Sequence, residues 1–178
     1  MTQIALIVGS LSSPSINRAF AEYIAEQAPS GVEITEVQIG DLPLYTQDLD
    51  AQSIPAYDRV RAQLQAADAV LIVSPEHNRN MPAALKNLID VASRPAGASL
   101  WAGKKVAIAT ASPSSYGGIN AGLHIRQSLQ SLDADVLIAP EVFLSRANAA
   151  LDNGKVADER TASFLKKFAV AFYAWAGQ

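Results

Sequence analysis

The chain has 178 residues, of which 49% are hydrophobic, and its 14 basic and 17 acidic residues give a net charge of −3. This length suits one domain, which we expect to span residues 1–178. The near balance of charge argues against nucleic acid as the main partner. The absence of cysteine excludes disulfides and thiolate chemistry. No apolar run approaches the roughly 20 residues needed to cross a bilayer, and no signal segment follows Met1, so we expect no membrane partner and a cytoplasmic location.

The first polar loop joins a predicted strand to a predicted helix. Residues 4–8 form a short apolar run typical of a strand, and the spacing of Ile16 and Phe20 is helical. The connecting residues 9–15 carry several hydroxyl groups beside backbone N–H groups that a first helical turn leaves unpaired. Such a loop suits a phosphate. The alternative is a plain polar turn in which Ser15 caps the helix.

The rest of the chain repeats this order of strand, polar loop and helix. Continuous apolar runs predict buried strands, and the alternating run 32–39 predicts a half-exposed edge strand. Proline near a helix start and periodic apolar residues predict the helices. Strands are predicted at residues 4–8, 32–39, 69–73, 106–111 and 135–139. Helices are predicted to begin near Ile16, Pro55, Pro82, Gly118 and Asp158.

Five strands alternating with five helices predict the α/β class. The expected architecture is a three-layer sandwich whose five-stranded parallel sheet has the order 2-1-3-4-5, with helices on both faces. In this order, ligands bind at the switch point flanked by the loops after strands 1 and 3. These loops, residues 9–15 and 74–81, are the two most polar of the chain. Two independent signals therefore favour a phosphate-bearing ligand at one crevice.

The glycine pattern of the first loop indicates which nucleotide would fit. A dinucleotide site would place Gly-x-Gly-x-x-Gly after the first strand, whereas only Gly9 is present. The Gly-Lys-Ser/Thr pattern of nucleoside triphosphate loops is absent as well. A single terminal phosphate, held by hydroxyl groups and a helix start, suits the residues better. In this strand order that ligand would be FMN.

Several short motifs resemble the NADPH-dependent FMN reductase family, which contains bacterial quinone and chromate reductases and related azoreductases. The similarity spans about residues 4–145, with the motifs in the same order and spacing. The motifs are Gly9-Ser10-Leu11, Ser15-Ile16-Asn17, Pro75-Glu76-His77-Asn78, Leu85-Lys86-Asn87-Leu88-Ile89-Asp90 and Gly117-Gly118. The resemblance implies a flavodoxin-like fold, bound FMN, NADPH or NADH as donor, and two-electron reduction of a small-molecule acceptor. Quinones are the expected acceptors, with chromate, azo compounds or free flavin as further candidates.

The resemblance also implies which residues surround the cofactor. The residues expected around the phosphate are Gly9, Ser10, Ser12, Ser15, Ile16 and Asn17. The residues expected along the isoalloxazine ring are Pro75, Glu76, His77 and Asn78, with Ser112, Tyr116 and Gly117 closing its other side. No catalytic side chain and no metal ligand are expected, because the flavin itself carries the hydride chemistry.

Two positions depart from the pattern of the family. Many relatives carry arginine where this chain has Ser12, and the missing arginine predicts weaker phosphate binding here. Many relatives also carry tyrosine where this chain has His77. The His77 side chain is expected to shape the substrate site as a steric wall, with proton donation as the alternative. The Glu76 carboxylate is expected to turn toward backbone N–H groups and away from a reduced, anionic flavin. Lys86, Asn87 and His124 are interpreted as structural.

Other functions use the same elements. A flavodoxin-like electron carrier would share the fold without turning over a substrate, although such carriers tend to be strongly acidic. A serine hydrolase is disfavoured, because no Gly-x-Ser-x-Gly elbow occurs. Residues 76–78 could also be a simple polar turn. The resemblance, together with Trp101 and Tyr116 as expected exposed aromatics near the crevice, predicts a homodimer or a homotetramer.

Overall fold

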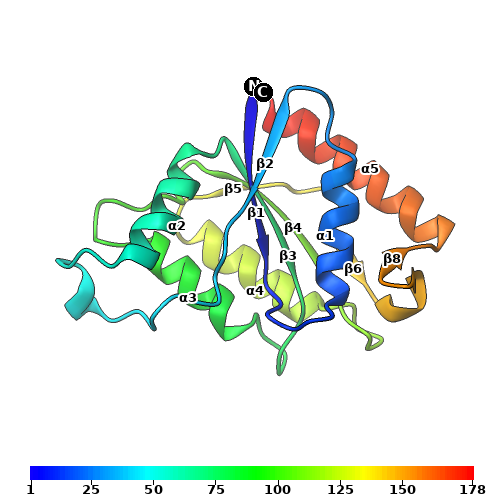
Figure 1. The fold of residues 1–178 in the computed structure, drawn as a ribbon, viewed down its shortest axis with the longest axis horizontal. Coiled ribbons are helices and arrows are strands. Elements are labelled where there is room, and N and C mark those ends of the chain that lie inside the picture. Colours follow the sequence, from blue (N-terminus) through cyan, green and yellow to red (C-terminus); the bar gives the residue numbers. More distant parts are fainter.

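The computed structural model describes residues 1–178 and is built on one parallel sheet. The strand order β2-β1-β3-β4-β5 confirms the predicted order 2-1-3-4-5 and the flavodoxin-like α/β class. The strands are β1 (Thr2–Val8), β2 (Val32–Glu36), β3 (Ala69–Ser74), β4 (Lys105–Ala111) and β5 (Asp135–Val136). Strands β1 to β4 run downward in Figure 1, so their carboxyl ends lie together at the bottom of that view, and β5 pairs with β4 in parallel.

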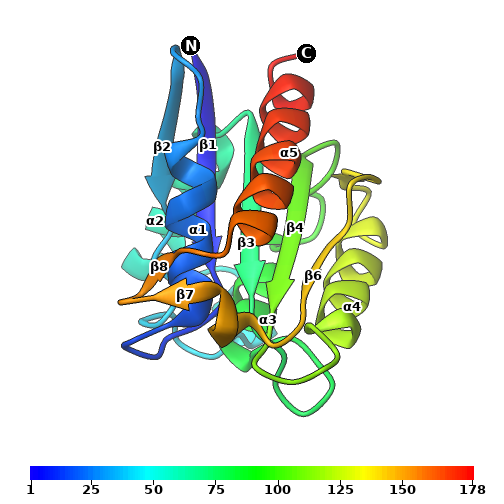
Figure 2. The same ribbon diagram turned by 90° about the vertical axis from the view of Figure 1, so that its right-hand side faces the viewer.

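Helices cover both faces of the sheet, as predicted. One face carries α1 (Ile16–Glu26) and α5 (Glu159–Ala176), which lie side by side in front of the sheet in Figure 2. The other face carries α2 (Pro55–Ala66), α3 (Ala83–Ala92) and α4 (Ile119–Gln130). Every residue of β3 is buried. This burial explains the continuous apolar run of β3, because its two faces both meet helices.

Two separate hydrophobic clusters fill the layers between the sheet and its helices, because successive strand side chains point to opposite faces. On the side of α2, α3 and α4, strand residues such as Ile7 and Ile72 pack with Leu64, Leu88 and Ile125. On the other side, the aromatic residues of α1 and α5 dominate: Phe20, Phe168 and Phe172. No helix is both long enough and apolar enough to span a bilayer.

The last predicted strand is shorter than expected. It ends at Val136, and the edge of the sheet resumes as β6 (Val142–Leu144), which pairs with β4 in parallel. Pro140 lies in the interruption, and proline has no N–H to donate to a strand ladder. Four short elements were not predicted from the sequence. One lies between β2 and α2, and three lie between β6 and α5: η1 (Gln47–Leu49), then η2 (Ala147–Ala150), β7 (Leu151–Asp152) and β8 (Lys155–Val156).

The prediction that Trp101 is exposed is wrong. Its side chain is fully buried in the core between the sheet and α2, α3 and α4, and its indole N–H donates to the Ile89 carbonyl over 2.9 Å. A single partner satisfies the only polar group of the ring, so burial costs little. Tyr116, by contrast, is 57% exposed, as expected.

A buried tyrosine joins the two helices on the other face. The Tyr173 hydroxyl in α5 donates to the Ile24 carbonyl in α1 over 3.0 Å, and burial raises the pKa of Tyr173 to about 12. The neutral phenol is favoured in the folded protein, so its stabilising effect is complete below the ordinary tyrosine pKa near 10 and is lost as the pH rises toward 12.

We therefore expect alkaline destabilisation that depends on Tyr173. Between pH 10 and 12 the free energy of unfolding should fall by about 1.4 kcal/mol per pH unit through this group. Tyr173→Phe should cost about 1 kcal/mol at neutral pH through the lost hydrogen bond, yet lose less stability in alkali. Urea unfolding of both proteins at neutral pH and near pH 11 measures the difference. An equal alkaline loss in the variant would assign the effect to other groups.

Candidate functional site

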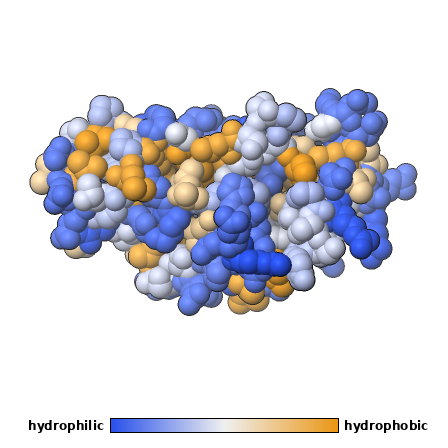
Figure 3. Space-filling view, turned by 90° about the horizontal axis from the view of Figure 1, so that it is seen from below, coloured by the Kyte–Doolittle hydropathy of each residue, from blue (hydrophilic) through white to orange (hydrophobic).

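The three predicted polar loops meet at one edge of the sheet. They follow the carboxyl ends of β1, β3 and β4, which are neighbours in the sheet, with Val8 in register with Val73 and Ser74 with Thr110. Every residue predicted around the cofactor therefore lies at this edge or in the helical turn that follows it. Figure 3 looks onto the edge and shows a mostly hydrophilic surface with separate apolar patches.

Gly9 lets the first loop leave the sheet close to β3. Its N–H donates to the Val73 carbonyl over 2.8 Å. A Cβ atom at this position would lie 2.5 Å from the Ser74 hydroxyl oxygen and 3.0 Å from the Ser74 Cβ. Only glycine therefore fits without a shift of β3, which explains the one glycine that the loop retains.

The hydroxyl groups of the first loop have different environments. Ser15 caps α1, because its hydroxyl oxygen accepts from the Arg18 backbone N–H over 3.2 Å. The capping alternative is thus correct for this residue, although its O–H remains free to donate to a ligand. Ser10 and Ser12 line a cavity of about 190 Å³ beside the loop, and the Ser12 side chain is exposed. The hydrogen-bonding capacity that a phosphate requires is present here.

An ion pair that the sequence did not predict borders the same cavity. The two terminal nitrogens of Arg18 donate to the two carboxylate oxygens of Glu36 over 2.9 and 2.7 Å. The hydrogen bond from Arg18 holds the pKa of the Glu36 carboxyl below its usual range. Many relatives carry an arginine at the position of Ser12, and here the Arg18 guanidinium of α1 brings a positive charge to the same cavity. That charge is already paired with the Glu36 carboxylate of β2.

Asn17 carries an orphan polar atom in this loop. Its side chain is 4% exposed, and its amide nitrogen donates to the Ala111 carbonyl over 3.3 Å, which fixes the orientation of the amide. The amide oxygen is buried without any partner. A buried acceptor calls for a donor, and a phosphate dianion has none. The free oxygen of Asn17 therefore suits a hydroxyl group, such as those of the ribityl chain of FMN, better than the phosphate itself.

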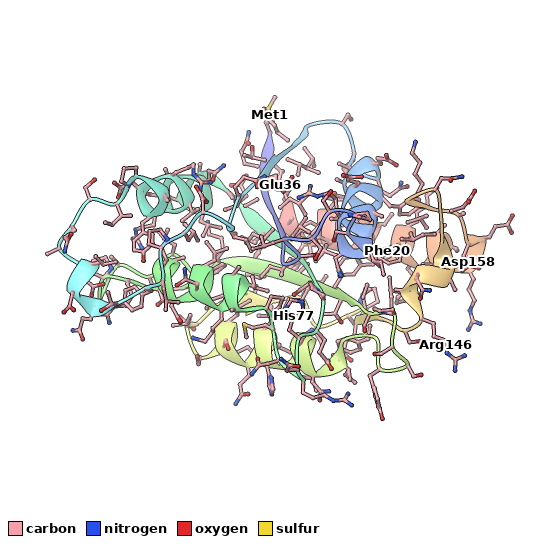
Figure 4. All side chains as sticks on the ribbon, turned by 60° about the horizontal axis from the view of Figure 1, so that its bottom comes forward. Met1, Phe20, Glu36, His77, Arg146 and Asp158 are labelled. Carbon is pink, nitrogen blue, oxygen red and sulfur yellow. The ribbon has the colours of Figure 1, made fainter.

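The second loop forms a tight hairpin turn. His77 and Asn80 exchange two backbone hydrogen bonds of 2.8 and 2.9 Å, while Asn78 and Arg79 adopt φ angles of 50° and 66°. Two consecutive left-handed residues are the mark of a type I′ turn and are costly for arginine. The turn thus holds the His77 side chain exposed at the edge, close to α3 and α4 (Figure 4).

The Glu76 carboxylate turns toward backbone N–H groups, which confirms the prediction. One of its oxygens accepts from the N–H groups of Asn120 and Ala121 over 3.0 and 3.2 Å, at the first turn of α4. The side chain is only 10% exposed, and Arg79 lies 3.6 Å away. Because the start of a helix carries positive partial charge, the carboxylate is stabilised there and ties the second loop to α4.

Several side-chain contacts hold the third loop. Gly117 has a φ of 64°, and its carbonyl accepts from the Thr110 hydroxyl over 2.9 Å. The Ser112 hydroxyl is 2.9 Å from that of Ser114. The Arg79 guanidinium lies 4.3 Å from the centre of the Tyr116 ring, a cation–π contact that joins the second and third loops.

The residues interpreted as structural behave differently from one another. Asn87 is buried and structural, since its amide oxygen accepts from the Tyr45 N–H and its amide nitrogen donates to the Pro43 carbonyl, both over 2.8 Å. Lys86 is exposed and paired with Asp90 at 2.6 Å. The His124 side chain is exposed and lines a cavity beside the second loop, because the buried stripe of α4 runs through other residues. Its interpretation as a structural residue stays a prediction.

Comparison with known proteins agrees with this geometry. The family model described as NADPH-dependent FMN reductase matches residues 2–149. A quinone reductase from Pseudomonas putida is 43% identical over 173 residues, which cover 97% of this chain and 93% of the relative. A 2-hydroxy-1,4-benzoquinone reductase from Burkholderia sp is 39% identical over 174 residues, covering 97% and 95%. The solved structure of the flavoenzyme NAD(P)H:(acceptor) oxidoreductase FerB from Paracoccus denitrificans is 34% identical with a TM-score of 0.91, covering 99% of this chain and 98% of that one.

Proposed function

This chain belongs to the NADPH-dependent FMN reductase family, and on that premise we propose that it passes two electrons from NAD(P)H through bound FMN to a quinone. The observation that carries the proposal is the convergence of three polar loops at the switch point of the sheet, with a buried orphan acceptor on Asn17. The family implies FMN as cofactor and NADPH or NADH as donor. Chromate, azo compounds and free flavin are further acceptors that the same chemistry would accept.

The first loop would bind the phosphate end of the cofactor. Backbone N–H groups of the first turn of α1 and the hydroxyl groups of Ser10, Ser12 and Ser15 would donate to the phosphate. Asn17 would accept from a ribityl hydroxyl, while Gly9 and Ile16 would shape the turn. These contacts would position the cofactor across the ends of the central strands, where the crevice of this fold is expected.

The second and third loops would hold the flavin ring. Pro75, Glu76, His77 and Asn78 would line one edge, with Ser112, Tyr116 and Gly117 on the other side. When bound, FMN supplies hydride acceptance and donation, so the protein needs no acid–base pair. The Glu76 side chain accepts hydrogen bonds at the start of α4, and His77 would limit the space for the substrate. One face of the ring must stay open for the donor and then for the acceptor.

Steady-state kinetics test the proposal. A single open face requires release of the oxidised nicotinamide before the quinone can stack in its place, so we expect parallel double-reciprocal lines. The measurement is a grid of NADPH and quinone concentrations with the FMN-loaded protein. Intersecting lines would contradict successive occupation of one site. A protein that is reduced by NADPH but does not turn over with any quinone would be an electron carrier.

FMN affinity should respond to an arginine at Ser12. Hydroxyl and N–H donors alone lack a bidentate, charge-assisted partner for the phosphate, and the nearby Arg18 is engaged by Glu36. We expect Ser12→Arg to strengthen FMN binding by about 1 kcal/mol, roughly fivefold in Kd, with a smaller gain at high salt. Fluorescence titrations of the apoprotein at two salt concentrations measure this.

The matched control is Ser163→Arg, which adds the same charge at an exposed position of α5. An equal gain in both variants would reflect long-range attraction and not a phosphate contact. Weaker binding by Ser12→Arg than by wild type at low salt would mean that Ser12 does not face the phosphate.

We expect residues 1–178 to act as one FMN-binding domain, in the cytoplasm, where reduced nicotinamide coenzymes are available. Tyr116, Ile119 and Leu123 expose apolar surface near the site, so a homodimer or homotetramer is expected. Analytical ultracentrifugation would reveal a monomer if this surface has no partner.

A further inference from the structure

A second hollow opens next to the turn that is proposed to line the flavin ring. We call it the α3–α4 groove, because it lies between that turn, the start of α3 and the outer face of α4. It has a volume of about 620 Å³, and two of its nine lining residues are hydrophobic. Its polar lining includes His77, Asn80, Lys86, His124, Gln127 and Ser128. No part of the first loop contributes to the groove, so it is separate from the proposed phosphate site of FMN.

The lining of the α3–α4 groove favours an anion. Its lining residues supply an ammonium group, imidazole and amide N–H donors and a hydroxyl, and none of them is acidic; the one neighbouring carboxylate is that of Asp90, which pairs with Lys86 from outside the lining. Phosphate groups match such a set, because they accept several hydrogen bonds and carry negative charge. His124 accounts for part of this chemistry, and its side chain is exposed on α4, where a ligand in the groove can reach it.

The position of the groove suggests which phosphate it takes. It begins at His77 and Asn78, the residues proposed beside the flavin ring. A reduced nicotinamide must stack on that ring, so the rest of the donor has to leave the crevice across an adjoining surface. Resting on the proposed function, we propose that the α3–α4 groove binds the phosphate-bearing adenosine half of the donor, with Lys86 and His124 holding the 2′-phosphate. The enzyme then selects NADPH over NADH.

Asp90 sets the strength of this selection. Both of its carboxylate oxygens lie 2.6 Å from the Lys86 nitrogen, one helical turn along α3. The pair is partly exposed, with side-chain exposures of 50% for Lys86 and 38% for Asp90, so the ammonium group can reorient toward a ligand. The carboxylate competes with the 2′-phosphate for the same cation. Removing the carboxylate should therefore raise the affinity for the 2′-phosphate, whereas removing the ammonium group should lower it.

The test compares 2′,5′-ADP with 5′-AMP, which differ in the 2′-phosphate, by calorimetry on the FMN-loaded protein. We expect wild type to bind 2′,5′-ADP more tightly. Lys86→Met should weaken 2′,5′-ADP binding about tenfold and lower the ratio of kcat/KM for NADPH over NADH by a similar factor. Asp90→Asn should raise both the affinity for 2′,5′-ADP and the ratio of kcat/KM for NADPH over NADH. Lys167→Met, an exposed lysine on α5 at the opposite face of the sheet, should change neither.

Two results would overturn the assignment. One is equal binding of 2′,5′-ADP and 5′-AMP by wild type, and the other is a loss in Lys86→Met that is the same for both ligands. Turnover separates this inference from the proposed function. Equal use of NADH and NADPH with a quinone would support quinone reduction and refute 2′-phosphate binding in the α3–α4 groove. Selective 2′,5′-ADP binding without quinone turnover would support 2′-phosphate binding in the groove and refute quinone reduction.

Discussion

Replacing Gly117 by alanine is expected to destabilise the protein and to weaken FMN binding severely. The residue has a φ of 64°, and an added Cβ would lie 2.6 Å from the Phe143 carbonyl oxygen and 2.7 Å from its carbon. Those atoms belong to the backbone of β6 and cannot rotate away. Left-handed strain and overpacking together should cost about 2–5 kcal/mol. Because the loop after β4 must shift, the proposed ring site should be displaced with it.

Gly154→Ala is the matched control for this change. Gly154 has a φ of 75°, yet a Cβ there would meet nothing within 4 Å. The control therefore carries the backbone strain without the collision, and it lies in the turn between β7 and β8, outside the proposed cofactor site. Urea unfolding and FMN titration of both variants measure the difference. Equal effects would mean that strain alone matters and that the contact with Phe143 is easily relieved.

Replacing Glu76 by leucine should have the second large effect. The substitution removes the acceptor of two backbone N–H groups at the start of α4 and leaves them beside an apolar side chain. A buried donor without a partner costs about 1–3 kcal/mol, so we expect a loss of about 2–4 kcal/mol in the free energy of unfolding. FMN binding should fall at least tenfold, because the loop after β3 is no longer tied to α4.

Glu76→Gln separates hydrogen bonding from charge. Glutamine keeps a carbonyl oxygen for the same N–H groups and loses only the charge that favours a helix start and the neighbouring Arg79. It should therefore recover most of the stability that leucine loses. Thermal unfolding of the two variants, with FMN titration in parallel, provides the comparison. If glutamine were as damaging as leucine, the negative charge and not the loop tether would be the essential contribution.

The sequence predicted the parts of the site that follow from strand order. Apolar runs locate β1, β3 and β4, and parallel pairing then brings the loops after them to one edge, so Gly9, Glu76 and Gly117 could be placed together without coordinates. The orientation of the Glu76 carboxylate was predictable for a similar reason. A carboxylate beside an anionic ligand needs donors, and helix starts supply them.

Contacts between residues distant in sequence were not predictable in the same way. The Arg18–Glu36 pair depends on how closely α1 lies against the end of β2, and neither residue stands out in its own segment. The only available signal was an unassigned arginine one position beyond Asn17, the last residue expected around the phosphate. The position of His124 beside the second loop was not predicted, because the apolar pattern of α4 does not show which polar residues face an adjoining loop. Trp101 was misplaced because its partner, the Ile89 carbonyl, lies on another element.

Anaerobic mixing of the FMN-loaded protein, first with NADPH and then with a quinone, tests the central claim most directly. We expect one equivalent of NADPH to bleach the visible flavin absorbance without a persistent radical signal. One equivalent of quinone should then restore the absorbance while the cofactor stays bound to the protein. Absence of bound flavin, failure of NADPH to bleach it, or bleaching that no quinone reverses would contradict the claim that this crevice performs two-electron transfer.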